Sequence, residues 1–358
     1  MMVHNFSAGP SILPQEVLNE ASEAIKNFDN LNLSLIEISH RSKNFVAVMD
    51  EAVALVKKLL KLPEGYSVIF LQGGASLQFT MLAQNLMKNN AGRAAYLDTG
   101  VWANKAIKEA KLFGEVEVVG SSADKNYNFI PKGYATPTNV DYFHCTSNNT
   151  IFGTQMHAFP KVEAPLVCDM SSDIFCREMD YTQFDLIYAG AQKNMGPAGA
   201  TLVIVKDEIL GKSGRVIPTM LDYTTHIKKE SMFNTPPVFA VYVSMLTLRW
   251  LDKNGGLSWI EARNRKKADL IYNEIDRNSL FFGTAEKEDR SLMNATFLLK
   301  DEAAHKEAFD KMWKEAGISG LNGHRDVGGY RASIYNAMPV ESVQVLVDVL
   351  KDFEQKHA

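Results

Sequence analysis

The chain has 358 residues, of which 46% are hydrophobic and 22% charged, and its formal net charge is -4. A chain of this length exceeds one hydrophobic core, so we expect two lobes. The acidic balance gives no electrostatic footprint for nucleic acid, no apolar run approaches the length of a membrane span, and the N-terminus has no basic segment followed by an apolar one. We therefore expect a cytoplasmic protein that binds neither nucleic acid nor a membrane.

The three cysteines are Cys145, Cys168 and Cys176, and no two of them form a CxxC pair. This spacing indicates reduced, mostly buried thiols, because a disulfide framework or a zinc site needs paired cysteines. We expect no metal.

The first elements surround a pair of cationic side chains. Gly9, Pro10 and Pro14 make residues 1–14 read as irregular, and Pro14 can open a helix that runs to about residue 28. A second helical pattern covers about 44–62, and His40 and Arg41 stand shortly before it. Two such side chains are either solvated surface or face an anion, and the residues alone leave both open.

A glycine pair follows the first predicted strand. YSVIFL (66–71) reads as a strand, a helical run covers 77 to about 87, and QGGAS (72–76) connects them. Glycines between a strand and a helix let backbone N–H groups surround a phosphate, and the helix N-terminus adds a favourable field. The pattern is neither the P-loop nor the dinucleotide motif, so a plain tight turn explains it equally well.

The next segments alternate between strand and helix. Strands at 94–98 and 115–119 with a helix at about 103–113, and further strands at 141–145 and 165–169, predict a parallel sheet. Trp102, at a helix start, is either core or a flat face for an aromatic ligand. Asp169 ends an apolar strand, where a carboxylate needs a partner or takes up a proton. A capping role in the Ser171–Asp173 turn is the alternative.

The stretch from 184 to 199, FDLIYAGAQKNMGPAG, organises our interpretation of the chain. It begins as a buried parallel strand that ends near Gly190, and ligands bind at such strand ends in open α/β sheets. Lys193 follows on a turn bordered by glycines. A lysine held there can stay dry enough to be an uncharged nucleophile, which is the condition for forming a Schiff base. An ordinary surface lysine is the alternative.

In the rest of the chain we expect a strand (200–205), a long connection (211–236) and a helix from Pro237 through residue 250. A second lobe is expected to begin near Gly255. That lobe reads as a helix (258–277), a strand (294–299), a helix (302–316), a glycine-rich loop (317–329), a strand (331–335) and a final helix. In and after the loop, His324, Arg325 and Arg331 suit a substrate with separate anionic groups, although a plain surface loop explains them too.

Together these features point to one ligand. Pyridoxal 5'-phosphate needs four contacts. They are a lysine that forms an imine, a carboxylate at a neighbouring strand end, a phosphate-binding turn at a helix start and an aromatic face.

The chain also resembles a known family. The segments that carry the resemblance are NFSAGPSILP, SHRS (39–42), QGGAS, GVW (100–102), NNTIFGT (148–154), CDMSSD (168–173), GAQKNMGPAG, NTPPVFAVY (234–242) and GHRDVGGYRASIYNA (323–337). Over essentially its whole length the chain is similar to the phosphoserine aminotransferases, a family of fold-type I pyridoxal phosphate enzymes. The resemblance implies an α/β fold, with a large domain (16–255) built on a mostly parallel sheet flanked by helices. A smaller α+β domain would comprise 1–15 and 256–358.

The resemblance also implies a role for each candidate residue. Lys193 would form the Schiff base and carry the proton to and from the α-carbon, and Asp169 would pair with the ring nitrogen. Trp102 would stack on the ring, and Thr150 would bond its hydroxyl. The phosphate would be held by Ala75, Ser76 and Gln192 from one subunit and by Asn234 and Thr235 from the other. The substrate would be held at its α-carboxylate by Arg331 and at its distal anion by His40, Arg41, His324 and Arg325.

The implied enzyme is a homodimer with shared active sites. It would transfer an amino group reversibly between L-glutamate and 3-phosphohydroxypyruvate, giving O-phospho-L-serine and 2-oxoglutarate in serine biosynthesis. Use of 4-phosphohydroxythreonine, in vitamin B6 synthesis, stays open. Some members carry an arginine where this chain has Ser76. The loss of one charge-assisted bond to the distal phosphate is typically worth about 1.5–3 kcal/mol.

Three other functions compete with this interpretation. A different small-domain transaminase fits the same cofactor residues. A cysteine desulfurase relative is disfavoured because the glycine-rich C-terminal loop has no cysteine. A binding or regulatory protein that kept only the pocket is disfavoured by the set Lys193, Asp169 and Arg331, since a pure binder needs no electron sink.

Overall fold

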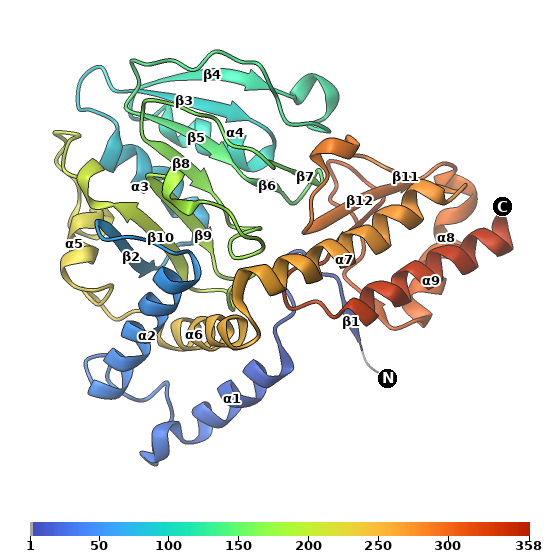
Figure 1. Ribbon diagram of the computed structural model, residues 1–358, viewed down its shortest axis with the longest axis horizontal. Helices are drawn as coiled ribbons and strands as arrows, with labels where there is room; N and C mark the ends of the chain where they lie inside the picture. Colours follow the sequence, from blue (N-terminus) through green and yellow to red (C-terminus); the bar gives the residue numbers. More distant parts are fainter. Residues whose placement is uncertain (1–2) are drawn as a thin grey trace.

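The computed structural model describes residues 3–358, and its largest element is a seven-stranded sheet (Figure 1). The strand order is β2-β10-β9-β8-β5-β3-β4. Only β10 runs opposite to the other strands of this sheet, so the predicted mostly parallel sheet is confirmed. Its strands are β2 (Tyr66–Leu71), β3 (Arg93–Asp98), β4 (Glu115–Ser121), β5 (Tyr142–Thr146), β8 (Leu166–Asp169), β9 (Leu186–Gly190) and β10 (Thr201–Lys206).

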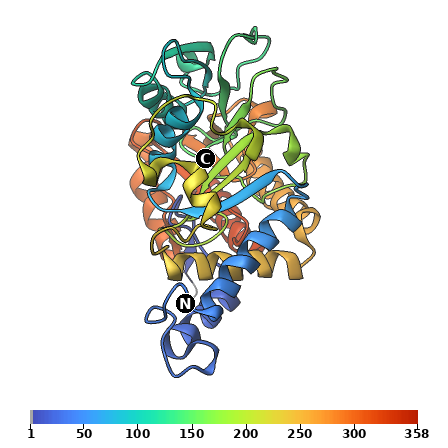
Figure 2. The ribbon, with the colours of Figure 1, turned by 90° about the vertical axis from the view of Figure 1, so that its left-hand side faces the viewer.

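Helices cover both faces of this sheet because its strands, apart from the edge strand β4, are largely buried on both sides. In β2, Val68 and Phe70 pack into one core and Ile69 and Leu71 into another, as the two-residue period of a strand requires. The first core is closed by α2 (Lys43–Leu59) and α6 (Val238–Lys253), with α1 (Gln15–Lys26) packed on α6. Figure 2 shows α1 extending beyond α6. The second core is closed by α3 (Gly74–Leu86), α4 (Val101–Ala110) and α5 (Tyr223–Lys228).

A second lobe holds a three-stranded antiparallel sheet, β11-β12-β14, and its own core (Figure 1). Its elements are α7 (Gly256–Arg277), β11 (Phe281–Gly283), β12 (Asn294–Leu299), α8 (Glu302–Glu315), β14 (Tyr330–Ser333) and α9 (Val340–His357). Helix α7 joins the lobes, since Leu257 and Ile260 lie in the first core and Ile271 and Ile275 in that of the second lobe. The domain division between residues 255 and 256 stays a proposal. With that division, α7 belongs to the second lobe by sequence but packs into the cores of both lobes.

Short elements complete the described chain. Two strand pairs join β1 (His4–Asn5) to β13 (Ile318–Ser319) and β6 (Asn148–Asn149) to β7 (Thr154–Gln155). The 3-10 helices are Phe28–Asn30, Ala123–Lys125, Tyr181–Gln183, Asp207–Ile209, Thr219–Leu221 and Lys287–Asp289. Among the helices of residues 3–358, none combines the length and apolar character needed to cross a membrane.

Three expectations about elements were wrong. The irregular start contains β1, which exists only because it pairs with a segment more than 300 residues later. The connection 211–236 contains α5 and a 3-10 helix. Helix α3 begins at Gly74, three residues before the expected start, so Ala75 and Ser76 lie in its first turn. The glycine pair was read as a connection, whereas the left-handed Gly73 serves as the N-cap of this helix.

Candidate active site

A cavity of about 340 Å³ lies beside the carboxyl ends of β5 and β8 and the segment that follows β9. This volume suits a small ligand or cofactor. Thr146 and Asp169, the last residues of β5 and β8, are paired in the sheet and both line it. Most of the predicted cofactor residues line this cavity, namely Ala75, Ser76, Trp102, Thr150, Asp169, Gln192 and Lys193. Among the predicted substrate residues, His324 and Arg331 line it.

Lys193 lies three residues beyond the end of β9 and lines the cavity. Its Nζ donates to Thr150 Oγ1 at 3.3 Å and lies 5.7 Å from the centre of the Trp102 ring. Burial lowers the pKa of this amine, and the Asp169 carboxyl partly opposes that effect. Lys193 therefore loses its proton more easily than an exposed lysine, which makes it a better nucleophile.

Asp169 is buried, with 4% of its surface exposed. Its Oδ1 accepts a hydrogen bond from the Ser171 amide at 2.9 Å. Burial raises the pKa of the carboxyl, while the bonds from Ser171 and the charge of Lys193 pull it down. A carboxylate in such a place is stabilised by a cationic or hydrogen-bonding group inside the cavity.

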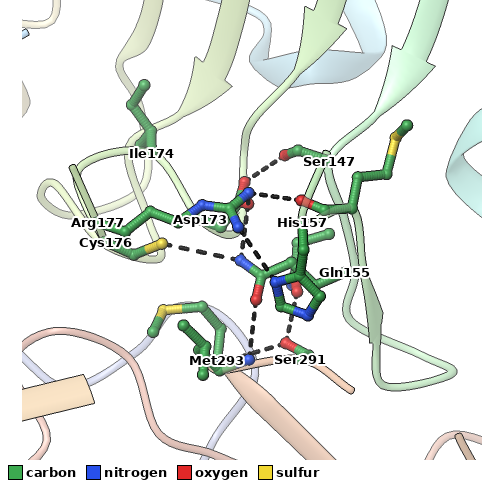
Figure 3. A network of polar contacts seen from close by, with 12 residues as sticks. Ser147, Gln155, His157, Asp173, Ile174, Cys176, Arg177, Ser291 and Met293 are labelled. Atoms are coloured by element: carbon green, nitrogen blue, oxygen red, sulfur yellow. Dashed lines mark hydrogen bonds and ion pairs between the residues drawn. The ribbon is translucent and has the colours of Figure 1, made fainter. Parts of the chain in front are cut away.

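A second buried carboxyl, Asp173, lies four residues further on and has different surroundings (Figure 3). Ser147 Oγ and Gln155 Nε2 donate to it, the latter at 3.0 Å, and the Arg177 guanidinium lies 3.7 Å away. Asp173 is not among the residues that line the cavity. Its partners are supplied by the protein, so of these two buried carboxyls Asp169 is the one available to a ligand.

The first turn of α3 forms one wall of the cavity. Gly73 and Gly74 both have positive φ, 89° and 65°, and this turn brings Ala75 and Ser76 to the cavity. The N–H groups of a first helical turn have no partner inside the helix and favour an anion, especially a phosphate. Gln192 lines the same cavity and offers an amide donor.

Arg331 brings the second lobe to the cavity from β14. It donates to the Thr150 carbonyl at 3.5 Å, and its Nε is buried without a hydrogen-bond partner among the described residues. The same holds for Trp102 Nε1 and Thr146 Oγ1, and all three residues line the cavity. Buried donors without partners indicate a bound group with acceptor oxygens. Together with Lys193, Asp169 and the α3 N-terminus, these residues fit pyridoxal phosphate and an anionic substrate.

Five predicted residues do not line this cavity in a single chain: His40, Arg41, Asn234, Thr235 and Arg325. His40 is buried, and burial followed by the charge of Arg41 lowers its pKa. Asn234 lines a separate cavity of about 110 Å³, and the Thr235 carbonyl accepts from Gln72 Nε2 at 3.2 Å. The Arg325 side chain is 90% exposed and lies 3.7 Å from Asp326.

The N-terminal segment contributes to the cavity, which no local sequence pattern predicted. Ala8 and Gly9 line the cavity, and a Cβ added to Gly9 would lie 3.5 Å from Lys193 Cγ. The Ser11 amide donates to the Gln192 carbonyl at 2.9 Å, and Ser11 Oγ donates to the Lys193 carbonyl. The AGP segment was read as a break and as one segment of the family resemblance, but it was given no role at the site. No local pattern tells that it packs on a lysine about 180 residues away.

Comparison with known proteins agrees with this geometry. The family model of class-V aminotransferases matches residues 3–346. The phosphoserine aminotransferase of Flavobacterium johnsoniae is 67% identical, over 99% of this chain and 100% of its own length. That of Parabacteroides distasonis is 56% identical, over 100% of both chains. The solved phosphoserine aminotransferase from Bacillus circulans subsp. alkalophilus has a TM-score of 0.96 and 45% identity, over 100% of this chain and 99% of its own.

A further solved structure, which concerns radiation damage of the Schiff base in phosphoserine aminotransferase, is 46% identical with a TM-score of 0.95, over 99% of this chain and 100% of its own. Full-length similarity at this level, on a fold with a lysine and a carboxylate at neighbouring strand ends, establishes the family. The chain belongs to the phosphoserine aminotransferases, within the pyridoxal phosphate-dependent class-V aminotransferases.

Proposed function

We propose that this enzyme transfers the amino group between L-glutamate and 3-phosphohydroxypyruvate, forming O-phospho-L-serine and 2-oxoglutarate. The observation that carries the proposal is one cavity lined by a buried lysine whose pKa is lowered, a buried carboxyl and an arginine without an Nε partner among the described residues. The high identity to proteins named phosphoserine aminotransferase supports the choice of substrates.

When bound, pyridoxal phosphate supplies an electron-accepting ring that stabilises negative charge at the substrate α-carbon. Lys193 would anchor the aldehyde and then act as the base that takes the α-proton, which its lowered pKa favours. Asp169 would hold a proton at the ring nitrogen. Trp102 would cover one ring face, and Thr150 would bond the ring hydroxyl.

The anionic groups would be divided between the two lobes. The α3 N-terminus, with Ala75 and Ser76, would hold the cofactor phosphate together with Gln192. Arg331 would bind the substrate α-carboxylate, since a guanidinium binds a carboxylate through two parallel hydrogen bonds. The distal anion, a phosphate or the glutamate side-chain carboxylate, would face His324, with Arg325, His40 and Arg41 as further cations.

We propose a homodimer in which the partner copy completes each site. Asn234 and Thr235 do not line the cavity of their own chain, which supports a role at the partner's cofactor phosphate. Leu33 and Ile36, just before His40, are exposed apolar side chains in this chain. An uncovered apolar segment is typical of a protein interface. A cytoplasmic location stays a prediction from the sequence.

Lysine replacement and a half-reaction screen test the activity. The purified enzyme should have a visible cofactor absorption band that Lys193→Ala abolishes, and an unchanged spectrum would exclude this lysine as the anchor. Glutamate should convert the enzyme to its amine form, and 3-phosphohydroxypyruvate should restore it much faster than pyruvate or glyoxylate. Equal restoration by all three would favour another transaminase. The 4-phosphohydroxythreonine reaction can be measured in the same assay.

Mixed dimers test the shared site. A Lys193→Ala chain and a chain with Asn234→Ala and Thr235→Ala are each expected to have low activity alone. After unfolding and refolding together, half of the dimers are mixed, and each mixed dimer has one site built only from wild-type residues. Activity should then rise to about a quarter of the wild-type value. Activity equal to the mean of the two separate preparations would show that each chain carries a whole site.

A further inference from the structure

Asn194, the residue after Lys193, is buried with 6% of its surface exposed, and it makes hydrogen bonds in two directions. Its Nδ2 donates to the Ile174 carbonyl at 3.1 Å and lies 3.5 Å from the Ser172 carbonyl. Its Oδ1 accepts from the Asn336 amide at 3.0 Å. A side-chain amide can do this without charge because its NH2 group donates while its separate carbonyl oxygen accepts.

The first direction leads to the turn that follows Asp169. Ser172 and Ile174 belong to this turn, and Asp173 between them is tied to Ser147, Gln155 and Arg177 (Figure 3). The turn is therefore fixed on its far side by a buried polar network. The hydrogen bond from Asn194 to this turn therefore ties the segment that carries Lys193 to the strand end that carries Asp169.

The second direction leads to the segment after the Arg331 strand. Helix α7 holds that segment, because Lys267 Nζ donates to the Ile334 carbonyl at 2.8 Å and to the Tyr335 carbonyl. One turn earlier on α7, Asn264 Nδ2 donates to Asn336 Oδ1 at 2.8 Å. Asn336 is thus part of a fixed frame that continues directly from the strand carrying Arg331.

We propose that Asn194 is a positioning residue. It fixes the position of Lys193 relative to Asp169 on one side and to Arg331 on the other. The proposal rests on the proposed role of Lys193 as the base. A lysine followed by Gly196 and Gly199 has a backbone that can shift, and proton transfer needs atoms placed within about 0.5 Å. Asn194 touches neither cofactor nor substrate in this proposal and acts only through Lys193.

The test compares Asn194→Ala with a matched control, Asn278→Ala. Asn278 is also buried, and it also donates twice, to Glu274 Oε1 at 2.8 Å and the Leu350 carbonyl at 3.2 Å, and accepts once, from the Leu280 amide at 3.0 Å. Both variants should have a lower melting temperature. Only Asn194→Ala should lower kcat, by about 100-fold, with a much smaller change in KM, because misplacement of about 1 Å has that effect on a reacting group.

A second readout uses the cofactor-free protein. The pH dependence of Lys193 modification by a small amine-reactive probe, followed by peptide mass spectrometry, gives the pKa of this amine. Because burial lowers that pKa, a loosened and better solvated lysine should titrate at higher pH in Asn194→Ala and at the wild-type pH in Asn278→Ala.

The proposal is overturned if Asn194→Ala behaves like Asn278→Ala in kcat and in the Lys193 titration. Should Asn194→Ala not fold, Asn194→Ser, which keeps a hydroxyl at the site, is judged by the same two measurements. The activity proposal is judged separately, since a cofactor band lost in Lys193→Ala supports it whatever Asn194 does.

Discussion

Asp169 and Asp173 show how two residues of the same type in one short segment are assigned different tasks by their surroundings. Both are buried, and burial raises the pKa of each. The pKa of Asp173 is lowered in part by Arg177, Ser147 and Gln155, all from the protein, whereas Asp169 faces the cavity. In the sequence they differ only in position, since Asp169 ends the predicted strand and Asp173 lies in the turn after it.

We expect Asp169→Asn to lower kcat by about 10²–10³-fold, the effect of losing one electrostatic partner of the reacting system, with little change in stability. Asp173→Asn should instead destabilise the cofactor-free protein by about 1–3 kcal/mol, because Arg177 then lacks its buried partner. Steady-state kinetics and urea unfolding of both variants measure the two effects. An activity loss in Asp173→Asn as large as that in Asp169→Asn would contradict the assignment.

At the scale of elements, the site depends on where helix α3 begins. The turn at Gly73 and Gly74 sets the direction of the first-turn N–H groups that face the cavity. A Cβ at Gly73 would lie 2.6 Å from Leu77 Cβ, on the helix itself, so the turn cannot relax without moving α3. This glycine is therefore required by both its φ and its close contact.

A left-handed conformation costs a residue with a Cβ about 1–2 kcal/mol, and Gly73→Ala should lower the free energy of unfolding by more than this. It should also weaken cofactor binding, measured by titration of the cofactor-free protein. Gly133→Ala is the control, since Gly133 has φ 72° and open space around a Cβ, so only the conformational cost applies. Equal cofactor affinity in the two variants would contradict the proposed role of α3 in binding the cofactor phosphate.

At the scale of the whole molecule, helix α7, which joins the two lobes, carries a buried amine. Lys267 on α7 has no exposed surface and donates to backbone carbonyls. Burial, followed by repulsion from Arg263, lowers its pKa well below 10.5. Below the folded-state pKa both states hold the proton. Between that pKa and 10.5 only the unfolded state holds it, so the folding free energy becomes more favourable as pH rises.

Urea unfolding of cofactor-free protein between pH 7 and 9.5 checks this effect. Lys267 should add a rise in stability of up to about 1.4 kcal/mol per pH unit within its window. Lys267→Met should lack that part of the rise, while Lys266→Met, at its exposed neighbour, should keep the wild-type slope. Parallel curves for wild type and Lys267→Met would show that this amine keeps its ordinary pKa.

Local patterns predicted most of the fold, since strand and helix periodicities act over a few residues. They set the strands of the sheet to within about two residues and also gave the lysine, carboxylate and glycine-pair signals. They failed where a partner lies far along the chain. Strand β1 depends on β13, more than 300 residues away. The start of α3 was missed for a local reason, because the left-handed Gly73 is its N-cap and lets the helix begin at Gly74.

By itself, the amino-acid sequence determined the chemistry of the candidate site, because amine, carboxylate, guanidinium and aromatic groups are properties of residue types and their strand-end positions. Tertiary structure alone decided that Arg331 lines the cavity while Arg325 does not, and that the partners of Asp173 are Ser147 and Gln155. It also brought Gly9 onto Lys193 and Asn194 onto Asn336. Such contacts join residues more than 100 positions apart, and they form only when packing of the two cores closes the loops between them.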